Sequence, residues 1–296
     1  MQAAIQIVVQ VSLMLLVVAV GLQSSWSDLS YVWRRPALLL RAFVAVNLDD
    51  PVCAEILCLA LPVDKMTKAG LVIMAVSPLA PFVLGKMMKT GADRAYVVGT
   101  YSALMAMSVL VVPATFALLG ILFGRDASVP IAMVARFVLM SVAAPLIVGV
   151  MITSWWKDFG HRAGPIATKL AFICLLPIVL LILYRSTGAA LALIGDGTLA
   201  VIILTVVGGI AAGHLLGGPE PERRAALAQA AATRHPGIAA MVANRHFDDK
   251  RVLLAIILFL LTSIAVSAIY AKWVTSRAAV QTRNHNGSEA LHPESY

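Results

Sequence analysis

Charged side chains are scarce in this sequence, because Asp, Glu, Lys and Arg make up only 13% of its 296 residues. Soluble globular chains are typically about 25% charged and about 45–50% apolar, whereas 60% of these residues are hydrophobic. With a mean hydropathy of +0.89, the composition excludes an ordinary soluble domain. We expect an all-α integral membrane protein surrounded by a lipid bilayer.

Cysteine is also rare, and Cys53, Cys58 and Cys174 all fall in apolar segments. Their odd number and spacing argue against a disulfide framework or a metal motif, so we expect small core side chains. The sequence contains no P-loop, Ser/His/Asp arrangement or zinc motif. We therefore expect no enzyme activity, no cofactor and no confident metal site, and ATP-driven transport by this chain alone is not expected.

Nine apolar segments are long enough to cross a bilayer, since a spanning helix needs about 20 residues. They are expected at residues 3–22, 37–61, 69–91, 96–119, 131–152, 166–184, 198–216, 225–244 and 250–273. Residues 1–273 would form one transmembrane domain, and residues 274–296 a polar, mostly loose tail.

Basic residues lie at the ends of the apolar segments, so the net charge of +8 does not indicate a nucleic-acid partner. The connections on one side hold thirteen Lys and Arg residues, and those on the other side hold eight. Cytoplasmic loops carry the excess of basic residues. We therefore expect an external N-terminus and a cytoplasmic C-terminus, in the cell inner membrane.

Two of the nine segments are interrupted at their middles by proline. Residues 69–91 contain Ser77, Pro78 and Pro81, and residues 225–244 contain Pro236. A proline inside a helix removes a backbone donor, and lipid cannot satisfy the groups that are freed. A matched pair of broken helices indicates the binding site of a secondary transporter.

The interrupted segments are the third and the eighth, so they enter the membrane with opposite polarity. This spacing predicts an inverted repeat whose first copy lacks one leading helix. The alternative is that two of nine helices merely contain prolines, which spanning helices tolerate.

The chain resembles the bile acid:sodium symporter family, within the wider bile/arsenite/riboflavin transporter group, as a divergent member. The resemblance rests on helix pattern and on a set of landmarks over roughly residues 8 to 270. These landmarks are Gly21-Leu22, Arg35-Pro36, Pro51, Ala69-Gly70-Leu71-Val72 before Ser77-Pro78, Gly91, Thr100, Pro113 and Gly237-Ile238-Ala239-Ala240.

The resemblance implies a mobile core domain that carries two crossed broken helices, and a separate panel domain. It also implies organic anions as substrates, commonly transported together with two sodium ions. The helix breaks would place half-helix ends near the bilayer middle, where N-termini favour anions and C-termini favour cations.

The chain departs from the family where sodium would bind. The family pattern Pro-Gly-Gly-x-x-Ser-Asn is here residues 78–84, in which Val83 and Leu84 replace the two polar ligands. In the second broken helix Ala230 replaces a glutamate, and Arg234 and His235 replace Gln and Asn. Val46 replaces a further Gln, and only Thr100 keeps its residue. Since buried cations need hard oxygen ligands, these changes argue against sodium coupling.

Arg234 is the residue in the breaks that we single out, and two roles stay open. Its positive charge could replace a bound cation or bind an anionic substrate, or it could form a structural ion pair with Asp49 or Asp50. One of the two carboxylates could carry a proton, and the other could pair with Arg41 or lie near water. The candidate substrate-binding residues are Ser77, Pro78, Pro81, Thr233, Arg234, His235 and Pro236.

Other polar residues near the two breaks are also assigned roles. Asp49, Asp50 and Thr100 are candidates for coupling or charge pairing. We interpret His235 as a cap of the broken helix, and we expect the Lys86 side chain to reach the membrane interface.

The function predicted from the sequence is secondary active transport of a small organic anion, resembling sodium-coupled symport of the bile acid type, with sodium coupling doubtful. The alternatives are a sodium-independent or proton-coupled anion carrier, and a membrane sensor that binds its ligand without transport.

Overall fold

The computed structural model describes residues 2–123, 129–191, 193 and 197–291. This part of the chain is helical and contains no strand, as the hydropathy pattern predicts. Its elements are α1 (Gln2–Gly21), α2 (Trp26–Ser30), α3 (Pro36–Phe43), η1 (Val44–Leu48), α4 (Asp49–Ala60), α5 (Lys65–Val76), α6 (Val83–Met88), α7 (Arg94–Phe123), α8 (Ile131–Val138), η2 (Leu139–Ala143), α9 (Ala144–Trp155), α10 (Lys157–Leu191), α11 (Thr198–Leu216), α12 (Pro221–Ala231), α13 (Pro236–His246) and α14 (Lys250–Leu291).

Four helical segments of the described chain are long and apolar enough to cross a membrane. They are Arg94–Ile121, Ile131–Trp155, Thr198–Leu216 and Lys250–Arg277, and Ile7–Gly21 is a shorter apolar helix. Each coincides with one of the nine predicted spans. The all-α membrane class is therefore confirmed, and the number nine stays a prediction.

The outer surfaces of these helices expose large apolar side chains. Leu110 on α7 is 65% exposed, and Ile173 on α10 and Leu204 on α11 are also exposed. Apolar patches of this extent are unfavourable in water. The surface therefore suits an integral membrane protein.

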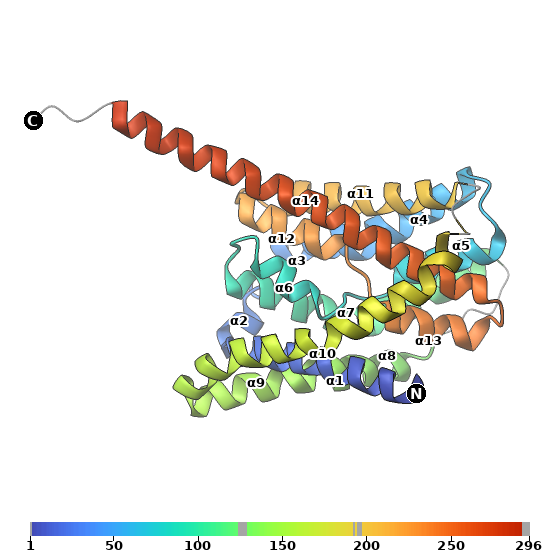
Figure 1. Ribbon diagram of the computed structural model, residues 1–296, viewed down its shortest axis with the longest axis horizontal. Coiled ribbons are helices and arrows are strands. Elements are labelled where there is room, and N and C mark those ends of the chain that lie inside the picture. The colour runs from blue at the N-terminus through green and yellow to red at the C-terminus, as the bar shows by residue number, and fades with distance from the viewer. Residues whose placement is uncertain (1, 124–128, 192, 194–196, 292–296) are drawn as a thin grey trace, which may run out of the picture.

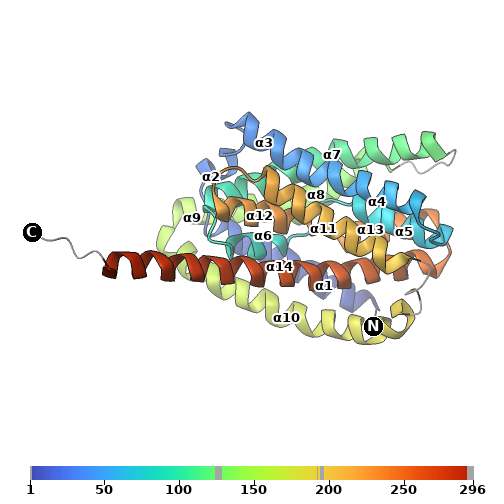
Figure 2. The same cartoon turned by 90° about the horizontal axis from the view of Figure 1, so that it is seen from above.

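The helices form two groups that lie side by side (Figure 1). One group packs α1 against α9 and α10. The other packs α11 against α4 and α12, and α14 against α5 and α13. Contacts between α10 and α14 join the groups, and Figure 2 shows these two helices alongside each other.

Both predicted breaks occur where the prolines are. The helix α5 ends at Val76, residues 77–82 are non-helical, and α6 starts at Val83. Ser77 is extended (φ −63°, ψ 146°), as expected for a residue before proline. The second break lies between Ala231 and Pro236, which occupies the first turn of α13, where a missing N–H costs nothing.

Proline alone does not determine a break in this protein. Pro113 lies inside α7, and Pro165 and Pro177 lie inside α10, yet both helices continue. At the first break two prolines stand three residues apart, so two successive turns lose donors. At the second, Pro236 follows an extended His235.

Two expectations for individual segments differ from the structure. The polar tail was expected to be loose, but α14 continues to Leu291 and projects past the other helices in Figure 1. Cys174 is exposed on α10, whereas Cys58 is buried as expected, because α10 turns that face away from the protein.

Candidate functional site: the crossing of the broken helices

The two helix breaks touch each other through their backbones. The N–H of His235 donates to the carbonyl oxygen of Pro78 over 2.8 Å. Each break leaves backbone groups without a partner in its own helix, and this bond pairs one group from each. Residues far apart in sequence thus meet at one buried point, which we call the crossing (residues 77–82 and 232–235).

Arg234 lies at the crossing and is only 1% exposed. Its Nε donates to Asp50 Oδ2 over 2.8 Å, and its Nη2 lies 2.8 Å from the same oxygen. Nη2 also donates to the Val46 carbonyl, and Nη1 to the Ser77 carbonyl at 3.5 Å. The guanidinium therefore links the second break to the first break and to the helix formed by α3, η1 and α4.

A local irregularity prepares the Val46 carbonyl for this contact. Residues Val44–Leu48 form a π-helical turn, and the N–H of Asp49 reaches back to the Val44 carbonyl. In such an i+5 pattern the backbone donor to Val46 would be Pro51, which has no N–H. The side chain of Arg234 supplies the donor instead. Nothing in the hydropathy pattern predicts this turn, although Pro51 was a visible signal.

The structure decides between the two acidic candidates. Asp50, which is 1% exposed, pairs with Arg234, whereas the Oδ2 of the half-buried Asp49 is buried and has no partner in the described part of the chain. Adjacent residues on a helix point about 100° apart, so only one can face the guanidinium. Arg41 is exposed and makes no ion pair with any described residue.

The helix α11 lies very close to the Asp50 side chain, at Gly209. A Cβ added at Gly209 would collide with Asp50 Oδ1, and the Ala231 carbonyl would lie 3.3 Å away. Glycine at 209 therefore lets α11 approach the buried ion pair. This explains part of the Gly208-Gly209 sequence that looks, from hydropathy alone, like ordinary close helix packing.

The two hydroxyl candidates are engaged in local bonds. Ser77 Oγ donates to the Ile73 carbonyl over 2.8 Å, and Thr233 Oγ1 donates to the Gln229 carbonyl over 2.9 Å. Both bonds reach back one turn and satisfy the ends of α5 and α12. In this conformation the two hydroxyl protons are used for helix termination.

His235 caps α13, as its sequence position suggests. Its Nδ1 accepts from the N–H groups of Gly237 and Ile238 at 3.1 and 3.3 Å. The ring meets Phe137 of α8 edge to face with centroids 4.8 Å apart. Its Nε2 is buried with no hydrogen-bond partner among the described residues, so the crossing presents one free polar atom beside α8.

Thr100 and Lys86 are not part of the Arg234 contacts. Thr100 is fully buried in α7, and its hydroxyl has no partner over the described ranges. Lys86 does not reach outward as expected, because its Nζ donates to Ser267 Oγ over 2.9 Å. Gln229 Nε2 donates to the Ser267 carbonyl over 3.0 Å. Nothing in the sequence pattern indicated Ser267, which bonds to Lys86, or Phe137, which packs on His235.

The arrangement suits charge neutralisation better than direct ligand binding in this conformation. Asp50 and two carbonyl groups take up the donors of Arg234. Two cavities of the described chain, about 360 and 610 Å³ in volume, are lined by none of the residues of the crossing. Among the described residues no group of three His, Cys, Asp or Glu side chains could hold a metal ion.

The model of the Sodium Bile acid symporter family matches residues 10–192, which is more than half of the chain. The matched part includes Asp50 and the first break, whereas Arg234 and the second break lie beyond its end. No curated protein matches the chain.

Proposed function

Because the chain belongs to the sodium bile acid symporter family, we propose that it is a secondary transporter of a small organic anion, in which buried Arg234 replaces a coupling cation. The family consists of transporters and not of enzymes. Membership thus sets the class, and the chemistry of the crossing supports the particular mechanism.

The observation that carries the proposal is the set of groups around Arg234. A carboxylate and two backbone carbonyls surround the guanidinium, and these are also groups that would surround a bound cation. A covalently attached charge satisfies the Val46 and Ser77 carbonyls permanently. A transporter built this way does not need sodium to neutralise Asp50.

The proposal gives the two groups of helices different tasks. The group of α1, α9 and α10 is the panel, and the group that carries the two breaks is the mobile core. The core helices α5/α6 and α12/α13 are the corresponding members of an inverted repeat, and nine spans complete the transmembrane domain over residues 1–273. The C-terminal segment 274–296 is then cytoplasmic.

The substrate anion belongs, in this proposal, beside the start of α13. The positive end of a helix dipole favours an anion there, and His235 Nε2 is a buried polar atom without a partner among the described residues. Phe137 of α8 packs against the same ring. Rocking of the core would separate α8 from His235 and admit the substrate.

The test is uptake of labelled organic anions (bile acids, pantoate and short keto acids) into proteoliposomes, with and without an inward sodium gradient. We expect uptake that does not require sodium and that Arg234→Gln abolishes. Arg224→Gln is the matched control, because it removes an arginine from the start of α12 whose Nε donates to the Gly218 carbonyl. The control should keep its uptake.

Two results would contradict the proposal. Stimulation by sodium would mean that the remaining oxygen atoms form a sodium site, and full uptake by a folded Arg234→Gln protein would remove the role of Arg234. An anion that binds the protein without counterflow exchange of label would indicate a sensor. A pH gradient applied in the same vesicles tests proton coupling, which we do not expect to drive uptake.

A further inference from the structure

A cavity of about 360 Å³ lies between α4, α5, α7 and α13, away from the crossing. Binding sites for small molecules commonly occupy roughly 300–1,000 Å³. The walls are mostly apolar, and the side chains that define its body are Cys58, Leu59, Val72, Ile73, Phe116 and Leu119. Such a wall suits an aliphatic ligand.

One part of the lining is polar and carries a positive excess. Lys65 and Lys68 from the start of α5 contribute two ammonium groups, against the single carboxylate of Glu55 on α4. His246, at the end of α13, also lines the cavity, and its Nε2 is buried without a hydrogen-bond partner among the described residues. A buried polar atom left unpaired is unfavourable, so a ligand with a hydrogen-bonding anionic head would stabilise this end.

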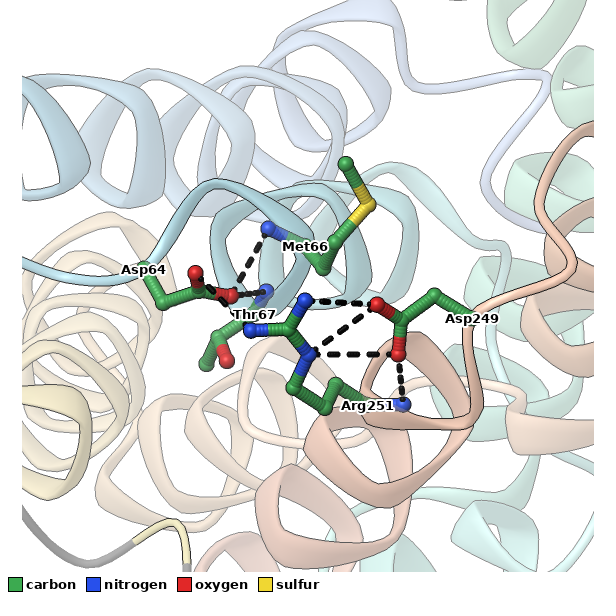
Figure 3. A network of polar contacts seen from close by, with 5 residues as sticks. All are labelled: Asp64, Met66, Thr67, Asp249 and Arg251. Atoms are coloured by element: carbon green, nitrogen blue, oxygen red, sulfur yellow. Dashed lines mark hydrogen bonds and ion pairs between the residues drawn. The ribbon is translucent and has the colours of Figure 1, made fainter.

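No carboxylate pairs directly with either lysine, although Glu55 lies close enough to Lys68 for a longer-range electrostatic attraction. Figure 3 shows Arg251 between Asp64 and Asp249, with ion-pair distances of 3.1 and 2.7 Å. Asp64 additionally caps α5 by accepting from the N–H groups of Met66 and Thr67. Within the described chain, neither lysine has a carboxylate oxygen within 4.0 Å of its ammonium group.

The same ion pairs lie near the basic end of the cavity. Arg251 belongs to α14 and pairs with Asp64 at the start of α5 and with Asp249 in the connection between α13 and α14, so the pairs join α14 to α5 there. Leu59, which lines the cavity, is 67% exposed on the outer surface of α4. The apolar part therefore opens toward the side of the molecule that would face lipid.

We propose that this cavity binds one acyl chain of an anionic amphiphile, along α5 and α7, with the anionic head group at Lys65, Lys68 and His246. The apolar lining matches the chain, and the two ammonium groups, which outnumber the single Glu55 carboxylate, match the head. The site is separate from the proposed transport site, because Pro78, Arg234 and His235 do not line it. A free fatty acid has this chemistry, and an anionic phospholipid offers it with one of its two acyl chains and its phosphate head group.

The test measures binding of oleate and of oleyl alcohol to the purified full-length protein in an uncharged detergent, with the shift in unfolding temperature as a second readout. Oleate should bind and raise the unfolding temperature in a concentration-dependent way. Lys65→Gln with Lys68→Gln should weaken oleate binding at least about tenfold, because charge-assisted hydrogen bonds are lost. Binding of the alcohol should be weaker and unaffected by the substitutions.

Two variants control this experiment. Lys250→Gln removes an exposed lysine at the same end of the molecule that does not line the cavity, and it should bind oleate normally. Ala69→Phe fills the cavity without a change of charge and should abolish binding of both amphiphiles. Equal affinity for acid and alcohol, or oleate binding that Ala69→Phe leaves intact, would overturn the proposal.

Native mass spectrometry of protein purified without added lipid can distinguish the two possible sources of the amphiphile. Retained phosphatidylglycerol that oleate displaces would identify a phospholipid chain, and an empty site that takes up oleate would identify a free fatty acid. Both readouts measure binding and not transport. Failure of this site therefore leaves the transport proposal untouched, and failure of uptake leaves this one untouched.

Discussion

The buried ion pair between Arg234 and Asp50 is the most consequential single contact in this protein. A charge taken out of water is costly, and the attraction of a partner together with hydrogen bonds offsets that cost. Here the guanidinium has a carboxylate and two carbonyls. We therefore expect the pair to specify the arrangement of the breaks more than to add net stability.

Breaking the pair from one side should destabilise the protein strongly. Asp50→Asn leaves the guanidinium buried without its carboxylate, and we expect a loss of about 3–5 kcal/mol in the free energy of unfolding. Arg234→Met combined with Asp50→Leu removes both charges and should recover most of that loss. The measurement is a double-mutant cycle by unfolding in detergent, in which Asp50→Leu and Arg234→Met are the two single variants. Additive losses in the double variant would show that the two side chains are not coupled.

The His235 cap gives a second prediction at the residue scale. His235→Ala removes the acceptor of the first N–H groups of α13, and loss of an N-cap costs about 0.5–2 kcal/mol. His235→Asn keeps an acceptor at that position and should restore most of the stability. If alanine and asparagine are equally unstable, the packing of the ring on Phe137 and not the cap is the important contribution.

At the scale of elements, the breaks turn two helices into four short ones that depend on their neighbours. The helix α6 has only six residues and α12 and α13 have eleven each, and isolated helices of such lengths are marginal. Close packing against neighbouring helices therefore has to stabilise them. The helix α5 packs on α14 at Gly70, where an added Cβ would collide with the Val252 carbonyl and lie 2.8 Å from Ala255 Cβ.

Alanine substitutions at two glycines should therefore have opposite effects. Gly70→Ala forces α5 away from α14, and overpacking of this kind typically costs about 1–3 kcal/mol. Gly85→Ala in α6 meets no atom within 4 Å and should be neutral or stabilise by about 0.4–1 kcal/mol. Unfolding temperatures of the two variants, compared with the parent, check the prediction. Similar values for both would argue against tight packing at α5.

The ion pairs at the start of α14 should respond to pH. Hydrogen bonds from the side chain and backbone N–H of Arg251 hold the pKa of Asp249 below its usual value. The stabilisation is therefore fully present above the unfolded-state pKa of about 3.9 and is lost as the pH falls through the lower folded-state value. The unfolding temperature of Asp249→Asn should be lower than that of the parent protein at neutral pH. The two temperatures should become equal only at the acid end of the pH range. A difference in unfolding temperature that stays the same at every pH would contradict this prediction.

At the scale of the whole molecule, two groups of helices lie side by side, and the crossing lies within one of them. From the group of α1, α9 and α10, the crossing is reached by α8, which runs through η2 into α9 and contacts His235 through Phe137. Movement between the groups would thus open the crossing while Arg234, which bonds only within its own group, keeps the breaks together. The excess of basic residues on one side of the predicted spans predicts how this assembly is oriented in the membrane.

Orientation is testable without any substrate. Asp248 follows α13 and Ser276 lies near the end of the chain, and both are exposed, on opposite sides of the last predicted span. Cysteines introduced one at a time at these positions, in a background without native cysteines, should differ in labelling by a membrane-impermeant thiol reagent. We expect labelling of intact cells at residue 248 and not at residue 276, which should react only after permeabilisation. The reverse labelling pattern would mean that the N-terminus is cytoplasmic and the C-terminus external.

The sequence by itself determined the membrane class, the helical fold and the positions of both breaks, because these depend on composition and on local proline chemistry. It also indicated Arg234 and the cap at His235. Only the tertiary structure decided that Asp50 and not Asp49 is the partner, that Lys86 bonds to Ser267, and that Val46 offers its carbonyl. These contacts join residues up to 188 positions apart. They depend on how helices pack and on which way each side chain faces, and neither follows from local sequence.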